Sequence, residues 1–288
     1  MTSKHHSRPA RGAGSQSEHP KQQLAALYTR VASAYVEQGP PRFAYVGRRL
    51  VEMVCVGVGD TVLDIGTGRG AVLFPAAERV GRSGRVVGID VAPGMVEHTR
   101  AAISEKGLPQ ADVHLMDAEN LLFPDESFTH VLCSFAVFFF PDLARVLAET
   151  WRVLRPGGVV GFAFQRGVDP RWAWYEELLR SEGALDNLPA LPSNGTSGRE
   201  GDLVARLVSA GFLETRERLE EVKLRYRDAQ TWWASLWTHG SRLPLERLER
   251  EHVARLQAEC LERAQTLAEP DGLPELHRFV FVTARRAA

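Results

Sequence analysis

Short apolar runs alternate with amphipathic segments over the middle of the chain. Runs rich in Val, Ile and Leu occur at residues 61–65, 85–90, 128–135 and 159–164. Between them, apolar residues recur at helical spacing over 95–106 and 142–154, as they do on one face of a helix. Alternating strands and helices of this length predict an α/β fold with a doubly wound, mostly parallel sheet.

The flanking parts of the chain follow other patterns. Helical spacing predicts helices over 24–35, 43–55, 169–182 and 202–210, and a long amphipathic helix over 245–267. We expect a loop over 185–200, a charged strand near 215–226 and a last strand over 277–283. We therefore expect one globular domain. Along the chain, it would consist of a disordered leader (1–20), an N-terminal helical cap (21–57), a core (58–165), an aromatic-rich cap interleaved with strands (166–275) and a final strand with its tail (276–288).

Composition narrows the class of protein. A chain of 288 residues that is 44% hydrophobic can bury one substantial core. Its net charge of −1, with both signs intermixed, argues against a nucleic-acid partner. The three cysteines form no close pair, and neither a membrane-spanning run nor a metal-ligand spacing is apparent. We therefore expect a cytoplasmic protein with no bound metal.

The motif at 62–70, Val-Leu-Asp-Ile-Gly-Thr-Gly-Arg-Gly, joins a buried strand to a glycine-rich turn. Such a turn lets a ligand approach the backbone because no Cβ stands in the way. The spacing of Gly66, Gly68 and Ala71 also fits a dinucleotide-binding turn. Asp64 favours S-adenosylmethionine (SAM) instead, because a carboxylate repels a pyrophosphate and attracts the ammonium and sulfonium of SAM.

Two further acids end strand patterns. Asp90 lies 20 residues after Gly70, where its carboxylate would accept hydrogen bonds from both ribose hydroxyls. Asp117 ends a short strand predicted at 114–118, where its side chain would accept from an adenine amino group and the Ala118 N–H would face a ring nitrogen. These positions predict an adenosine ligand without separating SAM from a dinucleotide.

The last motif is a helix predicted to stop at Pro156-Gly157-Gly158, before a fifth strand. Together these motifs resemble the class I SAM-dependent methyltransferases, and most closely the small-molecule branch similar to ubiquinone/menaquinone-biosynthesis methyltransferases. The resemblance covers about residues 24–165. It implies a seven-stranded Rossmann-like sheet, an antiparallel C-terminal strand and a substrate cap that varies with the acceptor.

The resemblance also implies positions for the cofactor. The glycine turn would hold the methionine end, Val91 and Met95 would pack beside the adenosine, and Ser134 would lie beside the sulfonium. The chain departs from the family at Thr129 and Val36, where the family often has Asp. The residues assigned to the cofactor are Tyr35, Asp64, Gly66, Thr67, Gly68, Gly70, Asp90, Val91, Met95, Asp117, Ala118, Ser134 and Phe135.

Few groups in the chain suggest acid–base chemistry. Methyl transfer is an in-line displacement that depends mainly on proximity and orientation. His239 is the best candidate base because histidine titrates near neutrality, although a residue in this position more often caps the helix end before Gly240. Phe138–Phe140 and the C-terminal tryptophans suggest a pocket for a flat, apolar acceptor, or they pack the cap. Trp232 and Trp233 cannot share one helix face, so one of them is expected in the core.

These patterns predict an enzyme that moves a methyl group from SAM to a small apolar or aromatic metabolite, such as a quinone precursor or a secondary-metabolite scaffold, with S-adenosylhomocysteine (SAH) as the product. A monomer or homodimer is expected. Two alternatives stay open. One is a SAM-binding protein that does not methylate, such as a cyclase-like catalyst or a regulator. The other is an NAD-dependent oxidoreductase, against which Asp64 and the Pro156-Gly157-Gly158 stop argue.

Overall fold

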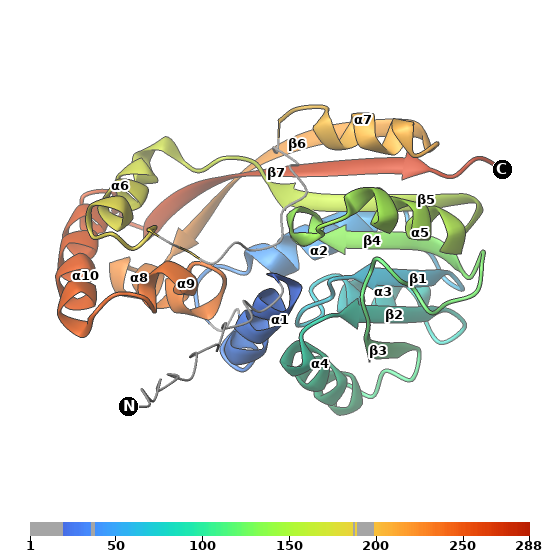
Figure 1. The fold of residues 1–288 in the computed structure, drawn as a ribbon, viewed down its shortest axis with the longest axis horizontal. Coiled ribbons are helices and arrows are strands. Elements are labelled where there is room, and N and C mark those ends of the chain that lie inside the picture. Colours follow the sequence, from blue (N-terminus) through green and yellow to red (C-terminus); the bar gives the residue numbers. More distant parts are fainter. Residues whose placement is uncertain (1–19, 36–37, 187, 189–198) are drawn as a thin grey trace, which may run out of the picture.

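A computed structural model describes residues 20–35, 38–186, 188 and 199–288. The leader predicted over 1–20 and the loop predicted over 185–200 therefore lie largely outside the described residues. A seven-stranded sheet with the order β3-β2-β1-β4-β5-β7-β6 runs through the molecule (Figure 1). Its strands are β1 (Thr61–Ile65), β2 (Arg85–Asp90), β3 (Ala111–Leu115), β4 (Phe128–Ser134), β5 (Leu154–Gln165), β6 (Leu213–Tyr226) and β7 (Leu273–Arg285).

The strand directions confirm the predicted architecture. The first five strands are parallel, and β7 pairs antiparallel with both β5 and β6. Successive side chains along each strand point to opposite faces, so Val62 and Leu63 enter different core clusters. One face is covered by α2 (Arg42–Met53), α3 (Leu73–Val80) and α4 (Pro93–Glu105), and the other by α5 (Leu143–Val153) and α7 (Asp202–Ser209).

The β6–β7 ribbon extends beyond the rest of the sheet and carries the second cap. Pairing of β5 with β7 stops at Gln165 and Phe279, whereas β6 and β7 stay paired as far as Tyr226 and Leu273. This far end of the ribbon packs into a tryptophan-rich cluster with the cap helices. These are α6 (Ala173–Ser181), α8 (Ala229–Ser235), α9 (Arg242–Leu245) and α10 (Arg250–Gln265), which gather at one end of the molecule in Figure 1.

Helix α1 (Pro20–Val31) lies between this cap and the sheet and packs on α4. A Cβ at Gly94 would lie 2.8 Å from the carbonyl oxygen of Thr29, so the glycine permits the close approach of the two helices. The N–H of Gly94 also donates to the Thr29 hydroxyl at 3.3 Å. Because α4 begins just after Asp90, this contact brings α1 over the carboxyl ends of the strands.

Some predicted boundaries were wrong. The helix predicted over 24–35 ends at Val31, where the chain tightens into turns that bond three residues back. The strand predicted over 114–118 lies at 111–115, because its partner β2 ends at Asp90, opposite Leu115. Helix α5 stops at Val153 and β5 starts at once, so Pro156-Gly157-Gly158 lie inside β5 at a register shift.

One prediction in the cap was also wrong, and another was incomplete. The helix predicted over 245–267 is interrupted between α9 and α10, since Glu249 adopts an extended backbone (ψ 152°) that the amphipathic pattern does not reveal. Trp232 and Trp233 are both buried, at 3% and 5% exposure, because the short helix α8 is enclosed by α10 on one side and β6 on another. Within the described ranges, no helix combines the length and apolar character needed to cross a membrane.

Candidate functional site

The glycine turn after β1 uses backbone conformations that favour glycine. Gly66, Gly68 and Gly70 all have positive φ, at 67°, 52° and 82°. A Cβ on Gly66 would lie 2.5 Å from the Cβ of Ala136, and one on Gly70 would lie 2.5 Å from the ring of Phe74. A Cβ on Gly68 would meet nothing within 4 Å. Packing therefore requires two of the glycines, and the third borders open space.

Asp64 is turned into the protein beneath this loop, with 1% exposure. Its Oδ2 accepts a hydrogen bond from the Thr67 hydroxyl at 2.7 Å. Burial raises the pKa of Asp64 to about 7, against the opposing effect of hydrogen bonds from Thr67 and the Leu73 N–H. The carboxyl group is therefore only partly ionised near neutrality. Its hydrogen bonds also help to hold the turn in place.

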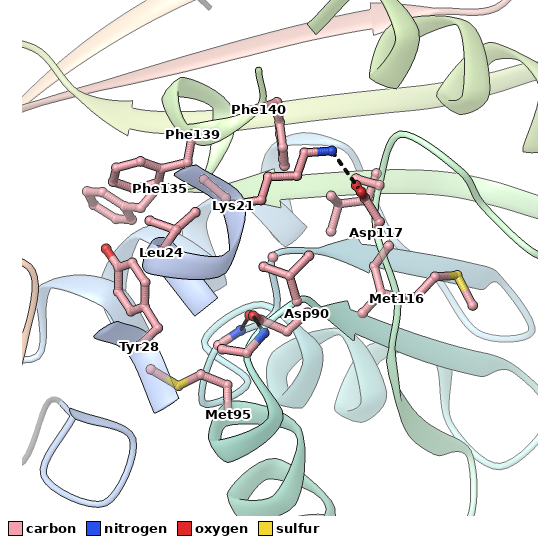
Figure 2. A pocket seen from close by; sticks show the side chains of 18 of the residues that line it. Lys21, Leu24, Tyr28, Asp90, Met95, Met116, Asp117, Phe135, Phe139 and Phe140 are labelled. Atoms are coloured by element: carbon pink, nitrogen blue, oxygen red, sulfur yellow. Dashed lines mark hydrogen bonds and ion pairs between the residues drawn. The ribbon is translucent and has the colours of Figure 1, made fainter. Parts of the chain in front are cut away.

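Asp90 ties the turn to the next strand and helix. One carboxylate oxygen accepts from the Gly68 N–H and the other from the Ala92 N–H, both at 2.9 Å. Burial raises the pKa of Asp90 despite these hydrogen bonds. The side chain borders a cavity at the carboxyl ends of β1, β2 and β4, which we call the Asp90 cavity (Figure 2).

The Asp90 cavity brings together most of the residues assigned to the cofactor. Those that line it are Tyr35, Gly66, Gly68, Asp90, Val91, Met95, Asp117, Ala118, Ser134 and Phe135. Asp64, Thr67 and Gly70 instead line an adjoining cavity beside the turn, which shares Tyr35, Gly66, Gly68, Ser134 and Phe135 with the first. Other lining residues are Lys21, Leu24, Tyr28, Ile65, Ile89, Ala92, Met116, Ala136, Phe139, Phe140 and Pro141.

Helix α1 closes the Asp90 cavity through Lys21. The Lys21 ammonium lies 2.7 Å from Asp117 Oδ2 and 2.5 Å from Glu119 Oε2. Figure 2 shows this lysine reaching across the cavity from α1, with Leu24 and Tyr28 on the same helix. No sequence pattern pointed to Lys21, because its partners lie 96 and 98 residues away and no motif links them.

Two residues at the end of β4 have unusual environments. The buried hydroxyl of Ser134 has no hydrogen-bond partner among the residues that the structure describes. Phe135 has a φ of 60°, a region in which a bulky side chain is strained. Its ring lies 4.8 Å from that of Phe43, centroid to centroid. An orphaned hydroxyl and a strained backbone at a cavity wall are features of ligand-binding positions.

A second cavity, which we call the aromatic cavity, lies between the sheet and the cap. Its volume is about 510 Å³, within the range of about 300–1,000 Å³ for small-molecule sites. Tyr28, Tyr35, Phe135 and Phe139 line both this cavity and the Asp90 cavity. The other lining residues are Arg42, Phe43, Phe138, Gln165, Val168, Trp172, Ala173, Tyr175, Glu176, Leu179, Tyr226, Trp232, Leu236, His239, Gly240, Ser241 and Glu275.

His239 lies in the wall of the aromatic cavity, directly after a 3₁₀ turn over Leu236–Thr238. Its Nδ1 is 3.3 Å from the Ser241 N–H, which leaves Nε2 to carry the proton of the neutral ring. Burial, together with the nearby positive charge of Arg42, lowers the pKa of His239 to about 3. The ring is therefore neutral and weakly basic at physiological pH.

The sheet order, the glycine turn and the acids at the strand ends define the class I SAM-dependent methyltransferase fold. Residues 62–158 match the family model described as a methyltransferase domain. The chain is 35% identical over 271 residues to a nocamycin O-methyltransferase of Saccharothrix syringae, covering 90% of this chain and 97% of that protein. An aklanonic acid methyltransferase of Streptomyces sp. strain C5 is 38% identical over 208 residues, which are 68% of this chain and 94% of the relative. The chain belongs to the SAM-dependent methyltransferases, and SAM is its cofactor.

Solved structures agree on the fold. A phosphoethanolamine N-methyltransferase of Haemonchus contortus, solved with SAM, has a TM-score of 0.54 at 16% identity, covering 92% of this chain and 57% of that one. The (4+2)-cyclase SpnF has a TM-score of 0.57 at 18% identity, covering 92% of this chain and 94% of that one. These identities establish shared architecture only.

Proposed function

We propose that this enzyme transfers the methyl group of SAM to a small aromatic secondary metabolite held in the aromatic cavity, and releases SAH. The observation that carries the proposal is the shared wall of Tyr28, Tyr35, Phe135 and Phe139 between the two cavities. The two cavities adjoin at these four residues. A donor in the Asp90 cavity and an acceptor in the aromatic cavity would therefore meet beside Phe135. In-line transfer depends chiefly on such positioning.

The cofactor fits the Asp90 cavity by residue chemistry. The backbone of Gly66 and Gly68 and the adjoining Asp64, Thr67 and Gly70 would hold the methionine end. The open space at Gly68 leaves room for a ligand, and the unpartnered Ser134 hydroxyl favours a polar one. SAM supplies a methyl group activated by a sulfonium.

The strand-end acids would hold the nucleoside. Asp90 would accept hydrogen bonds from the ribose hydroxyls, and Val91 and Met95 would pack beside the adenosine. Asp117, with the Ala118 N–H, would bind the adenine edge. Asp117 Oδ1 accepts from the Glu119 N–H and Oδ2 from Lys21, which leaves a lone pair on each oxygen for the adenine amino group.

The acceptor class rests on the lining of the aromatic cavity and on the relatives. The ring centroids of Trp172 and Trp232 lie 4.7 Å apart in its wall, and Phe138 and Phe139 line the same cavity. Flat rings of this kind suit a fused aromatic scaffold. The named substrates of the two relatives, nocamycin and aklanonic acid, support the same class of small molecule.

We propose that His239 orients the acceptor instead of removing its proton. With a pKa of about 3 the ring is a weak base, but its Nε2–H is a hydrogen-bond donor at the cavity wall. Water exclusion by the surrounding rings would strengthen that hydrogen bond.

A cavity-filling variant tests the two-cavity proposal. Ala173 lines the aromatic cavity and does not line the Asp90 cavity. Ala173→Trp should lower kcat/KM for aromatic acceptors at least ~tenfold and leave SAM affinity unchanged, because it occupies acceptor space only. Ala254→Trp, on the exposed face of α10, is the matched control. Unchanged turnover in Ala173→Trp, or loss of SAM binding instead, would show that the acceptor binds elsewhere.

A further inference from the structure

Three cavities meet at two aromatic residues. The first is the Asp90 cavity and the second is the aromatic cavity. The third is the cavity that Thr67 and Gly70 line beside the glycine turn, which we call the turn cavity. Tyr35 and Phe135 line all three, whereas the other described residues of their walls line one or two. The junction of the three cavities therefore lies beside these two rings.

This junction matches the shape of SAM. The sulfur atom of SAM is bonded to three groups, namely the adenosyl carbon, the methionine chain and the methyl group. In the arrangement proposed above, the nucleoside lies in the Asp90 cavity, the methionine end lies beside the turn, and the methyl group faces the aromatic cavity. The sulfur would then lie where the three cavities join, next to Tyr35 and Phe135. This step rests on the proposed function.

The junction is aromatic and not acidic. Among the described residues, each acid in these walls borders one cavity only. The acids are Asp90 and Asp117 in the first cavity, Asp64 and Glu78 in the turn cavity, and Glu176 and Glu275 in the aromatic cavity. Arg42 borders the turn cavity and the aromatic cavity, and its charge interacts with the carboxylate of Glu275. The wall that all three cavities share therefore offers a positive sulfur two rings instead of a carboxylate.

We propose that Tyr35 and Phe135 bind the sulfonium through cation–π interactions and thereby make the enzyme favour SAM over SAH. The negative face of an aromatic ring attracts a cation within about 6 Å of its centroid, and more strongly where water is excluded. Transfer of the methyl group breaks the S–CH₃ bond and leaves its electron pair on sulfur, so the thioether of SAH is neutral. The rings then have no cation to attract, which weakens binding of the product relative to the cofactor.

Packing holds both rings at the junction. Phe43 stacks on Tyr35, with centroids 5.4 Å apart and an interplanar angle of 30°, and meets Phe135 edge to face at 4.8 Å. Phe135 keeps a φ of 60°, which a bulky side chain adopts only where its surroundings enforce it. Figure 2 shows its ring beside that of Phe139, at the edge of the Asp90 cavity. The strained backbone thus places the Phe135 ring at the junction.

An aromatic ring also does not compete for the methyl group. A carboxylate in contact with the sulfonium could itself take the methyl group, whereas a phenyl ring has no lone pair to donate. Burial raises the pKa of Tyr35 well above its usual value, so its hydroxyl keeps its proton and does not become a phenolate nucleophile. Both residues therefore bind the cation without reacting with it.

Ligands that differ in charge at one position test the proposal. SAM carries a sulfonium, SAH carries a neutral thioether, and sinefungin carries a carbon with an ammonium group at the same place. Calorimetric titration of the enzyme without acceptor gives the affinity for each. Tyr35→Leu and Phe135→Leu keep an apolar side chain but remove its π face, so each should lower the ratio of SAM affinity to SAH affinity at least ~fivefold. Tyr35→Phe keeps the ring and should leave this ratio within about twofold of the wild-type value. Sinefungin should lose affinity as SAM does.

Phe140→Leu is the matched control, because Phe140 lines the Asp90 cavity and neither of the other two. It should leave the ratio unchanged even where it weakens both ligands. If Phe135→Leu does not fold on its strained backbone, Tyr35→Leu alone decides the test. An unchanged ratio in the leucine variants, an equal fall in Phe140→Leu or Tyr35→Phe, or sinefungin that behaves like SAH would overturn the proposal. A wild-type enzyme that binds neither SAM nor SAH would instead refute the proposed cofactor site.

Discussion

The ammonium of Lys21 lies 2.7 Å from Oδ2 of Asp117, so the first helix is tied to the acid proposed to bind the adenine. The same ammonium contacts Glu119 at 2.5 Å, and helix α1 covers the Asp90 cavity. Entry of the cofactor past α1 would disturb these contacts. The helix is therefore a wall of the site, and we expect it to slow exchange of the cofactor.

Replacing Lys21 should speed cofactor exchange. Lys21→Met removes both ion pairs, each partly exposed and so worth at most about 1 kcal/mol. We expect SAH association and dissociation to accelerate severalfold while the equilibrium affinity changes less. Stopped-flow fluorescence measures both rates. Lys223→Met, on β6 and paired with Glu269, is the control. Unchanged exchange rates in Lys21→Met would mean that α1 does not limit access.

Replacing Asp90 should weaken SAM binding at least ~tenfold. A carboxylate that accepts hydrogen bonds from two ribose hydroxyls contributes more than about 1.4 kcal/mol to the binding free energy. Calorimetric titration of Asp90→Ala with SAM measures the loss. The variant also frees the N–H groups of Gly68 and Ala92, so its thermal unfolding must be followed in parallel. Asp271→Ala removes an exposed acid that lines neither the Asp90 cavity nor the aromatic cavity, and this variant should bind SAM normally. Retained affinity in Asp90→Ala would refute the ribose assignment.

Two glycines in the turn should respond differently to a Cβ. Gly66→Ala forces a contact of 2.5 Å with Ala136 and should lower the free energy of unfolding markedly. Gly68→Ala meets no atom within 4 Å, so it should cost only about 1 kcal/mol for its positive φ while obstructing the Asp90 cavity. Chemical denaturation and SAM titration of both variants separate the effects. Equal loss of stability in the two variants would contradict the observed packing.

Asp64 should make stability depend on pH. Its folded-state pKa of about 7 lies above the usual 3.8, so the folded protein holds this proton more tightly than the unfolded chain does. The stabilising contribution is complete below about pH 4 and is lost as the pH rises through 7. Asp64→Asn should flatten that part of the profile, measured by urea unfolding at several pH values. An identical pH profile in the variant would mean that Asp64 ionises normally.

His239 should prove dispensable as a base. Because burial holds its pKa near 3, its protonation state does not change between pH 6 and 8. His239→Gln keeps a hydrogen-bond donor and should retain most of kcat, with KM for the acceptor rising modestly. A pH profile of kcat between 6 and 8 checks this. A large fall in kcat that is relieved at high pH would restore histidine as the general base.

Local spacing predicted which strand-end residues would lie together, because a parallel sheet brings the carboxyl ends of its strands to the same edge. Gly66, Asp90 and Ser134 needed no knowledge of distant contacts. Lys21 and Arg42 could not be found in this way, since their relevance comes from helices that pack across the site from far along the chain. The break at Glu249 was missed for a related reason: the apolar stripe of α10 continues in phase beyond it.

The cap resisted prediction because its packing is set by several elements at once. One tryptophan of the Trp232–Trp233 pair was expected in the core, and α10 and the β6–β7 ribbon bury both. The aromatic cavity arises from this enclosure, between residues such as Phe43 and Trp232 that no local pattern relates. The residues that line the aromatic cavity can therefore be identified only once the fold is known.

The most direct test of the account is methyl transfer from trideuteriomethyl-SAM to polycyclic aromatic acceptors, followed by mass spectrometry of both products. We predict one labelled methyl group on the acceptor for every SAH formed, and the loss of both products in Asp90→Ala. An acceptor that rearranges at unchanged mass with SAM intact would contradict methyl transfer and point to a cyclase-like role.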